Sequence, residues 1–171
     1  TWTGRRDHAI ILTAAQTGLR AAELLGLDCS DIHLGTGAHI TCVGKGRKHR
    51  VTPLIPITVA TLRVWLTERA GRPDEPLFPT RQGRRLSHDA LEHRLTKHAT
   101  AASRNCRSLA DKKITPHVLR HTAAVRLLNA PVDTATIALW LGHESDQTTQ
   151  IYLHADLTLK QRAIDRTAPP G

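Results

Sequence analysis

The sequence predicts a mainly α-helical domain with one small antiparallel β-sheet, an α+β fold. Apolar runs with helical spacing, bounded by glycine, proline or capping residues, fill most of the chain. Two β-prone runs joined by a short polar segment give one hairpin signal. The chain has 171 residues, of which 40% are hydrophobic, enough to bury one core. One domain over residues 1–171 is therefore expected.

The first elements are two helices. An unbroken, mostly apolar run from Arg5 to Gln16 predicts a helix that closes at Thr17-Gly18. A second short helix is expected over residues 21–25, ended by Gly26.

A β-hairpin with a basic tip follows. Residues 38–43 and 50–55 are the two β-prone runs, and the polar segment 44–49 between them contains two glycines and three basic residues.

Helices return after the hairpin. Thr58 is expected to cap a helix that ends at Ala70-Gly71, and the proline-rich stretch 71–85 is expected to be a loop. Ser87 is expected to cap the next helix, which runs to about Ala101. In the last third, helical patterns cover residues 116–129, 133–141, 147–153 and 158–166.

The charge balance favours a polyanionic partner. Lys and Arg number 24 against 15 Asp and Glu, giving a net charge of +9 and a pI of about 10.3. These basic residues are spread along the chain, which indicates a folded basic surface and not a basic tail. Charge alone fits nucleic-acid binding, ribosomal and membrane-surface proteins equally.

Other classes are disfavoured. The three cysteines are an odd number and form no CxxC pair, which disfavours disulfide bonds and a structural zinc site. No apolar run is long enough to span a bilayer, so a soluble, intracellular protein without a membrane partner is expected. The chain begins at Thr1 and has no methionine, which suggests a piece of a longer protein.

The densest chemical signal is the segment 114–121. Thr115 can cap a helix whose first residue is Pro116, which places His117 and Arg120 on one face of the first turn. The free N–H groups and the dipole of this turn favour an anion such as a phosphate. An ordinary solvated or salt-bridged helix face is the alternative.

Four further residues carry weaker local signals. His143 follows the helix-ending Gly142, and Tyr152, nine residues later, is the single tyrosine. Arg20 precedes a helix in which Glu23 can hold its guanidinium, and Lys45 lies in the hairpin tip. Each also fits a purely structural or solubilising role.

Together and in this order, the segments resemble the tyrosine recombinase or phage integrase family, with Xer-like spacing. The matching motifs are Thr17-Gly-Leu-Arg20, the hairpin segment 44–50 with Pro53-Leu54, the segment 117–121, Leu141-Gly-His143 and Tyr152. The resemblance spans residues 7–154. It implies the tyrosine recombinase catalytic-domain fold.

The resemblance also implies roles for single residues. Tyr152 is the expected nucleophile, with Glu23 and His121 as supporting residues and Arg47, Lys48 and Arg50 as DNA-binding residues. No metal and no cofactor are implied. The other expected catalytic residues are Arg20, Lys45, His117, Arg120 and His143.

The implied function is site-specific recombination or integration of double-stranded DNA through a 3′-phosphotyrosyl intermediate, for a mobile element. The implied setting is the bacterial cytoplasm, in association with the nucleoid. Such enzymes act as homo-tetramers on DNA, although this chain alone could be a monomer. The family has a separate N-terminal domain that clamps DNA, and we expect this chain to lack it.

Residues 156–171 are expected to form a C-terminal helix and tail that can be exchanged between subunits. The short helix 158–166 has an apolar stripe, and packing of the tail on its own chain is the alternative. Two other functions stay open: relaxation of DNA by a type IB topoisomerase, which reseals the same strand, and regulation by a catalytically silent DNA-binding protein.

Overall fold

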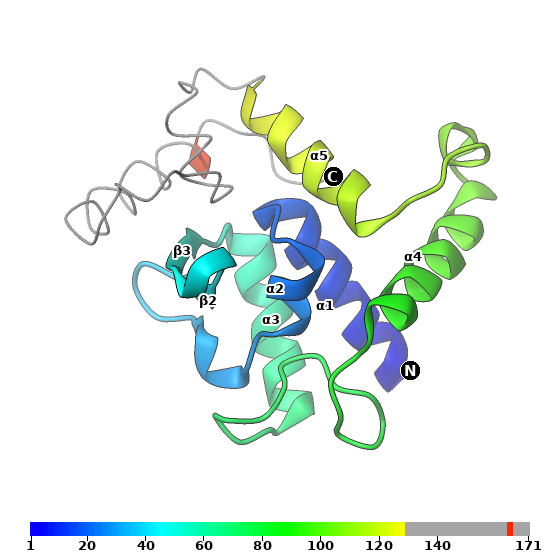
Figure 1. The fold of residues 1–171 in the computed structure, drawn as a ribbon. Coiled ribbons are helices and arrows are strands. Elements are labelled where there is room, and N and C mark those ends of the chain that lie inside the picture. Colours follow the sequence, from blue (N-terminus) through cyan, green and yellow to red (C-terminus); the bar gives the residue numbers. More distant parts are fainter. Residues whose placement is uncertain (129–163, 166–171) are drawn as a thin grey trace.

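The computed structural model describes residues 1–128 and 164–165. Within these ranges the protein is mainly helical with one small sheet, as predicted. The sheet and α4 lie on opposite sides of α1 (Figure 1). In chain order the elements are α1 (Trp2–Thr17), α2 (Ala21–Leu25), β1 (Ile32–His33), β2 (His39–Val43), β3 (His49–Pro53), α3 (Pro56–Arg69), α4 (His88–Ser103) and α5 (Pro116–Leu128).

Helix α1 is the centre of the described core. Ala9 and Ile10 are at most 1% exposed, and α1 packs against both α3 and α5. The largest side chain of the core, Trp65 on α3, is also 1% exposed, and its indole N–H donates to the carbonyl oxygen of Leu77 at 2.8 Å. The core thus joins the helices to the long loop that contains Leu77.

The predicted helix ends are mostly confirmed. Gly18 ends α1 in the left-handed conformation (φ 66°), which glycine adopts without a steric penalty. Helix α2 has the predicted bounds, and Ser87 caps α4 by accepting from the N–H of Ala90 at 3.1 Å. Ala70 ends α3, also in the left-handed conformation.

The prediction that Thr58 caps α3 is wrong. The helix begins at Pro56 with Ile55 as its N-cap, and Thr58 is fully buried inside the first turn. Proline fits the first helical position because its missing N–H has no partner there in any case. Pro56 therefore starts the helix two residues before the expected cap.

The hairpin is confirmed, with strands one or two residues displaced from the prediction. Strands β2 and β3 are antiparallel, with Cys42 opposite Arg50 and Val43 opposite His49. Strand β1, which has only two residues, pairs with β2 on its other side and was not predicted. A two-residue strand is too short to show the alternation by which strands are recognised in sequence.

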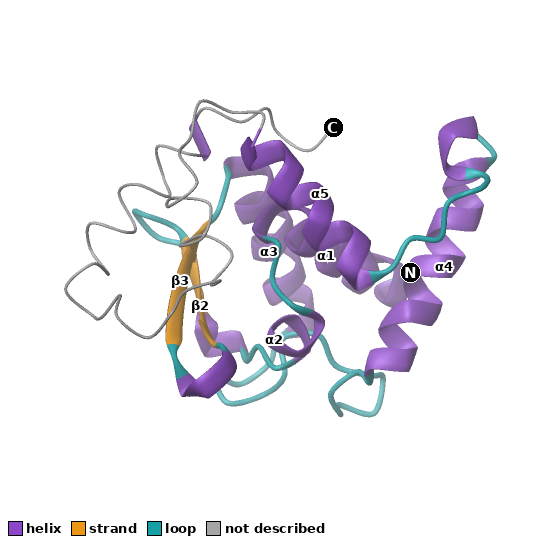
Figure 2. Cartoon of the chain, turned by 45° about the horizontal axis from the view of Figure 1, so that its top comes forward, coloured by secondary structure: helices purple, strands orange, loops and turns teal. Residues whose placement is uncertain are grey.

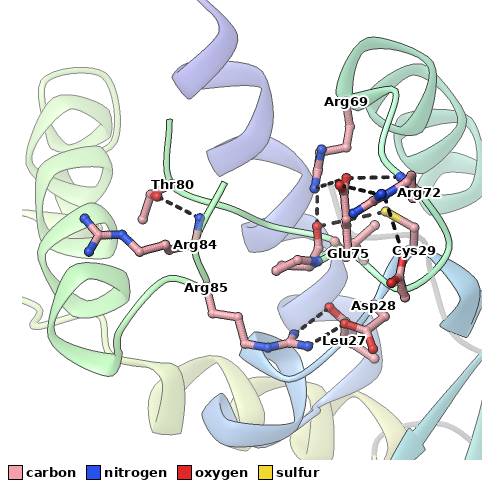
Figure 3. Close-up of polar contacts among 12 residues, drawn as sticks. Leu27, Asp28, Cys29, Arg69, Arg72, Glu75, Thr80, Arg84 and Arg85 are labelled. Atoms are coloured by element: carbon pink, nitrogen blue, oxygen red, sulfur yellow. Dashed lines mark hydrogen bonds and ion pairs between the residues drawn. The ribbon is translucent and has the colours of Figure 1, made fainter. Parts of the chain in front are cut away.

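The loop 71–85 is tied to the rest of the fold by polar contacts (Figure 3). The Arg69 guanidinium bonds to the carbonyl oxygen of Pro76 at 3.1 Å and to the carboxylate of Glu75 at 3.2 Å. At the other end, Arg85 reaches Asp28 at 2.5 Å and the carbonyl oxygen of Leu27 at 3.2 Å. The loop predicted from its prolines is therefore irregular but anchored.

A buried ion-pair network joins α1 to α4 and to the same loop. Asp7 is 1% exposed and accepts from Arg6 at 2.7 Å and from His98 of α4 at 2.8 Å. The Arg94 guanidinium lies 3.7 Å from the same carboxylate, and Arg6 also donates to the carbonyl oxygen of Pro79 at 2.9 Å. No motif in the sequence predicted this network.

Several predictions concern residues outside the described ranges. These are the helices 133–141 and 147–153 and most of the tail 156–171. Of the predicted helix 158–166, Ile164 and Asp165 are described; both are helical, and Ile164 is 5% exposed. Among the helices that the structure describes, none has the length and apolar composition needed to cross a membrane.

Candidate active site

Glu23, which lies on α2, is the centre of a cluster of charged side chains. Its carboxylate accepts from the backbone N–H of Arg20 at 2.9 Å, which closes the first turn of α2. The same carboxylate pairs with the Arg20 guanidinium at 3.3 Å and with the Arg50 guanidinium at 2.5 Å. The predicted support of Arg20 by Glu23 is therefore present, with Arg50 as a second and shorter pair.

Arg120 of α5 lies near this cluster. It donates to the carbonyl oxygen of Gly18, just before α2. The pKa of Arg120 is lowered to about 10, first by burial and then by the nearby charges of Arg20 and Arg50, against the opposing effect of Glu23. Arg120 is still protonated at neutral pH, so the cluster holds more positive than negative charge and favours an anion.

Lys45 lies at the tip of the hairpin, next to this cluster. The tip is a tight turn in which Gly44 N–H donates to the carbonyl oxygen of Lys48 at 2.7 Å and Gly46 has a φ of 73°. A Cβ atom built on Gly44 would lie 3.2 Å from Oε1 of Glu23. Gly44, which precedes Lys45, is therefore in close contact with the carboxylate that holds Arg20.

The first turn of α5 has the predicted cap. The Thr115 hydroxyl accepts from the N–H of Val118 at 3.2 Å, and Pro116 is the first helical residue. His117, His121 and Arg120 all lie on this helix; the two histidines are exposed, whereas Arg120 is partly buried. The structure thus brings Arg120 to Arg20, and leaves the two histidines at the surface.

The three hairpin residues expected to bind DNA differ in their exposure to solvent. Arg47 and Lys48 are exposed at the tip. Arg50 is instead 8% exposed and paired with the buried Glu23, so it faces inward and not toward a ligand outside the fold. Its position in the sequence could have indicated this, because Arg50 shares the alternation of the buried residues Thr52 and Leu54.

Two predicted catalytic residues, His143 and Tyr152, lie outside the described residues. Within the described residues, no cluster of three or more His, Cys, Asp or Glu side chains is placed to hold a metal ion. The described part of the candidate site is therefore a set of guanidinium groups around one carboxylate, next to a lysine-bearing turn. Both hairpin and α2 contribute to it, and they lie side by side in both views (Figures 1 and 2).

Comparison with known proteins identifies the family. The model of the phage integrase family matches residues 2–158, which is most of the chain. This chain belongs to the phage integrase family. A Sinorhizobium fredii protein named as an integrase/recombinase is 52% identical over 169 residues, which are 99% of this chain and 51% of that protein.

Tyrosine recombinases of the Xer type are also similar to this phage integrase family member. Tyrosine recombinase XerC of Vibrio vulnificus is 35% identical over 167 residues, covering 96% of this chain and 51% of XerC. The chain thus spans about half the length of the curated relatives that it matches.

Solved structures agree with the assignment. The XerH site-specific recombinase, in a post-cleavage complex with its difH substrate, has a TM-score of 0.72 and 30% identity over 96% of this chain and 46% of that one. The XerA recombinase has a TM-score of 0.71 and 30% identity over 98% of this chain and 64% of that one. The predicted tyrosine recombinase catalytic-domain fold is confirmed.

Proposed function

We propose that this chain is the catalytic domain of a site-specific DNA recombinase or integrase. It cuts and rejoins double-stranded DNA through a 3′-phosphotyrosyl intermediate on Tyr152. Membership of the phage integrase family and the likeness to Xer recombinases support this function. The observation that carries it is the meeting of Arg20 and Arg120 around Glu23, next to the turn that bears Lys45.

The two arginines would bind the phosphate that is attacked. A guanidinium can contact two oxygens of a phosphate at once, and the negative charge on these oxygens grows in the transition state. Burial and, after it, repulsion by Arg20 and Arg50 lower the pKa of Arg120, and a bound phosphate would offset that repulsion. His143 would add a hydrogen bond to the same phosphate.

The remaining groups would move protons. The oxygen of Tyr152 bonds to phosphorus as the bond from phosphorus to the 5′ oxygen breaks, and His117 assists removal of the tyrosine proton. Lys45 gives a proton to the departing 5′ oxygen, which leaves as a hydroxyl. His121 supports this site from the same helix, and Arg47 and Lys48 would contact the DNA backbone from the exposed tip.

Rejoining is the reverse reaction with a new partner. The phosphotyrosyl bond keeps the energy of the original phosphodiester, so a 5′-hydroxyl of another strand can displace Tyr152 without an external energy source. Integration, excision or transposition of a mobile element is the biological outcome that we propose. The active form would be a homo-tetramer on DNA.

The proposal is tested by trapping the covalent intermediate. The chain is incubated with a pool of duplexes that carry a randomised core and a nick just 3′ of it, so that the cleaved end fragment diffuses away and resealing stops. Denaturing electrophoresis then separates DNA bound to protein, and sequencing of that DNA identifies the preferred site. A labelled adduct is expected for the natural chain and none for Tyr152→Phe.

The same assay separates the alternatives. Transfer of the trapped strand to a second duplex with a free 5′-hydroxyl supports recombination, whereas resealing of its own strand alone indicates a topoisomerase. DNA binding without any adduct indicates a silent regulator and contradicts the proposal.

A further inference from the structure

Arg50 is a buried cation that the proposed chemistry does not use. It is 8% exposed, and its partner Glu23 is 5% exposed by side chain. Burial of two charges costs free energy that their mutual attraction recovers only when the geometry is good. Nη2 of Arg50 lies 2.5 Å from Oε2 of Glu23, so the two buried charges are in direct contact.

The other oxygen of Glu23 lies against the hairpin tip. Oε1 would be 3.2 Å from a Cβ atom on Gly44, closer than most side chains are tolerated, while the φ of Gly44 (−91°) is available to any residue. Glycine at position 44 thus avoids a tight contact with Glu23, and the backbone conformation there does not require glycine. Lys45, the next residue, begins the turn that this contact positions.

Arg50 also connects the hairpin to the arginines that would bind phosphate. It lies on β3, opposite Cys42 of β2, while Glu23 holds Arg20 on α2. The charge of Arg50 is close enough to lower the pKa of Arg120 on α5. One buried ion pair therefore joins the strand that leads away from Lys45 to α2, and its arginine lies near enough to Arg120 of α5 to affect that residue electrostatically.

We propose that Arg50 is a positioning residue for proton transfer by Lys45. By holding the Glu23 carboxylate between Gly44 and Arg20, Arg50 fixes the distance of the lysine-bearing tip from the phosphate site. This inference rests on the proposed function of the chain. It adds that loss of Arg50 should impair departure of the 5′ oxygen more than it impairs phosphate binding.

The test uses a leaving group that needs no proton. In a duplex with sulfur in place of the bridging 5′ oxygen, the bond from phosphorus to sulfur breaks and the thiolate leaves unaided, because a thiol has a pKa near 8.5 and an alcohol has a far higher one. The site selected with the randomised pool supplies the sequence for both duplexes. Lys45→Ala is the reference variant, slow on the oxygen duplex and restored on the sulfur duplex.

Arg50→Lys keeps the charge at position 50 but changes the geometry of the pair with Glu23. We expect it to cleave the oxygen duplex about 10²-fold more slowly than the natural chain, and the sulfur duplex within about fivefold of it, since general acid catalysis contributes 10²–10⁴-fold. Gly44→Ala, which disturbs the same contact from the hairpin, should also be slow on the oxygen duplex and nearly natural on the sulfur duplex. Thermal unfolding verifies that each variant is folded.

Arg69→Lys is the matched control, because it alters an Arg–Glu pair with Glu75 in the loop of Figure 3. It should cleave both duplexes at the natural rate. An equal loss of rate on both duplexes by folded Arg50→Lys and Gly44→Ala, or no loss on either, overturns the positioning role. An adduct with Tyr152→Phe, or no sulfur rescue of Lys45→Ala, contradicts the proposed function itself, so the two failures are distinguishable.

Discussion

Side chains of opposite charge meet in the candidate site. Glu23 is buried and serves three partners, namely the backbone and guanidinium of Arg20 and the guanidinium of Arg50. Arg120 is held close to these cations although their charges repel it. Such an arrangement costs folding free energy until an anion binds, which is typical of a site adapted to a charged ligand.

The first prediction concerns Arg20 and Arg120, the two arginines that we propose bind the phosphate. Arg20→Ala and Arg120→Ala should each slow formation of the covalent adduct by at least about two orders of magnitude, the usual effect of losing one donor to a developing negative charge. Single-turnover cleavage of the selected duplex measures this. Cleavage at a nearly natural rate by either variant would remove that arginine from the site.

The second prediction concerns stability at the same position. Below pH 10 Arg120 is charged in the folded and the unfolded chain, and its lowered pKa means that the charge is less favourable in the folded one. Arg120→Met should therefore raise the free energy of unfolding, by about 1 kcal/mol once solvent screening of this half-buried group is considered. Thermal unfolding at neutral pH measures it. A lower Tm would mean that the bond to Gly18 outweighs the repulsion.

At the scale of elements, local chemistry predicted most helix ends and missed what depends on distant residues. Gly18, Ser87 and Thr115 act as expected because a cap needs only its own turn. The pairing of Arg50 with Glu23 was missed, since it joins residues 27 positions apart and each residue looks solvent-facing by type. Within the described ranges, Arg20, Glu23 and Arg120 of the motifs lie near one another, but the motifs did not indicate that Arg50 is buried.

The third prediction concerns the link between α1 and α4. Asp7→Ala should destabilise the fold by about 3–5 kcal/mol, because it leaves the buried Arg6 without its carboxylate and releases His98 and Arg94 of α4. Glu68→Ala is the matched control; it removes a pair whose arginine is 53% exposed by side chain, and it should cost far less than Asp7→Ala. Urea unfolding of both variants measures the difference. An equal loss of unfolding free energy in both variants would show that the Asp7 network does not stabilise the link between α1 and α4.

At the scale of the molecule, the net charge of +9 is the broadest property that bears on function. Exposed Lys45, Arg47 and Lys48 place part of this charge on the hairpin tip, next to the guanidinium cluster. The second property of the whole molecule is where the C-terminal residues 156–171 pack. We propose that they pack on a neighbouring subunit in the tetramer. Burial of Ile164 within a single chain supports packing in cis for the isolated protein.

The fourth prediction is a steep dependence of DNA affinity on salt. Each phosphate neutralised by a Lys or Arg releases counterions, so affinity for a duplex should fall by about tenfold or more between 50 mM and 200 mM salt. Fluorescence anisotropy with a labelled duplex measures it. Arg47→Ala combined with Lys48→Ala should flatten the slope, while an affinity that does not change with salt would contradict a surface that follows phosphates.

The central claim is that Tyr152 becomes covalently bonded to DNA. Peptide mapping of the trapped adduct tests it most directly, because the tryptic peptide 127–160 contains the single tyrosine of the chain. After digestion with trypsin and nuclease, mass spectrometry should find a nucleotide attached through a 3′-phosphate to Tyr152 in that peptide. A nucleotide attached to any other residue, or an unmodified peptide 127–160 in the purified adduct, would contradict the account.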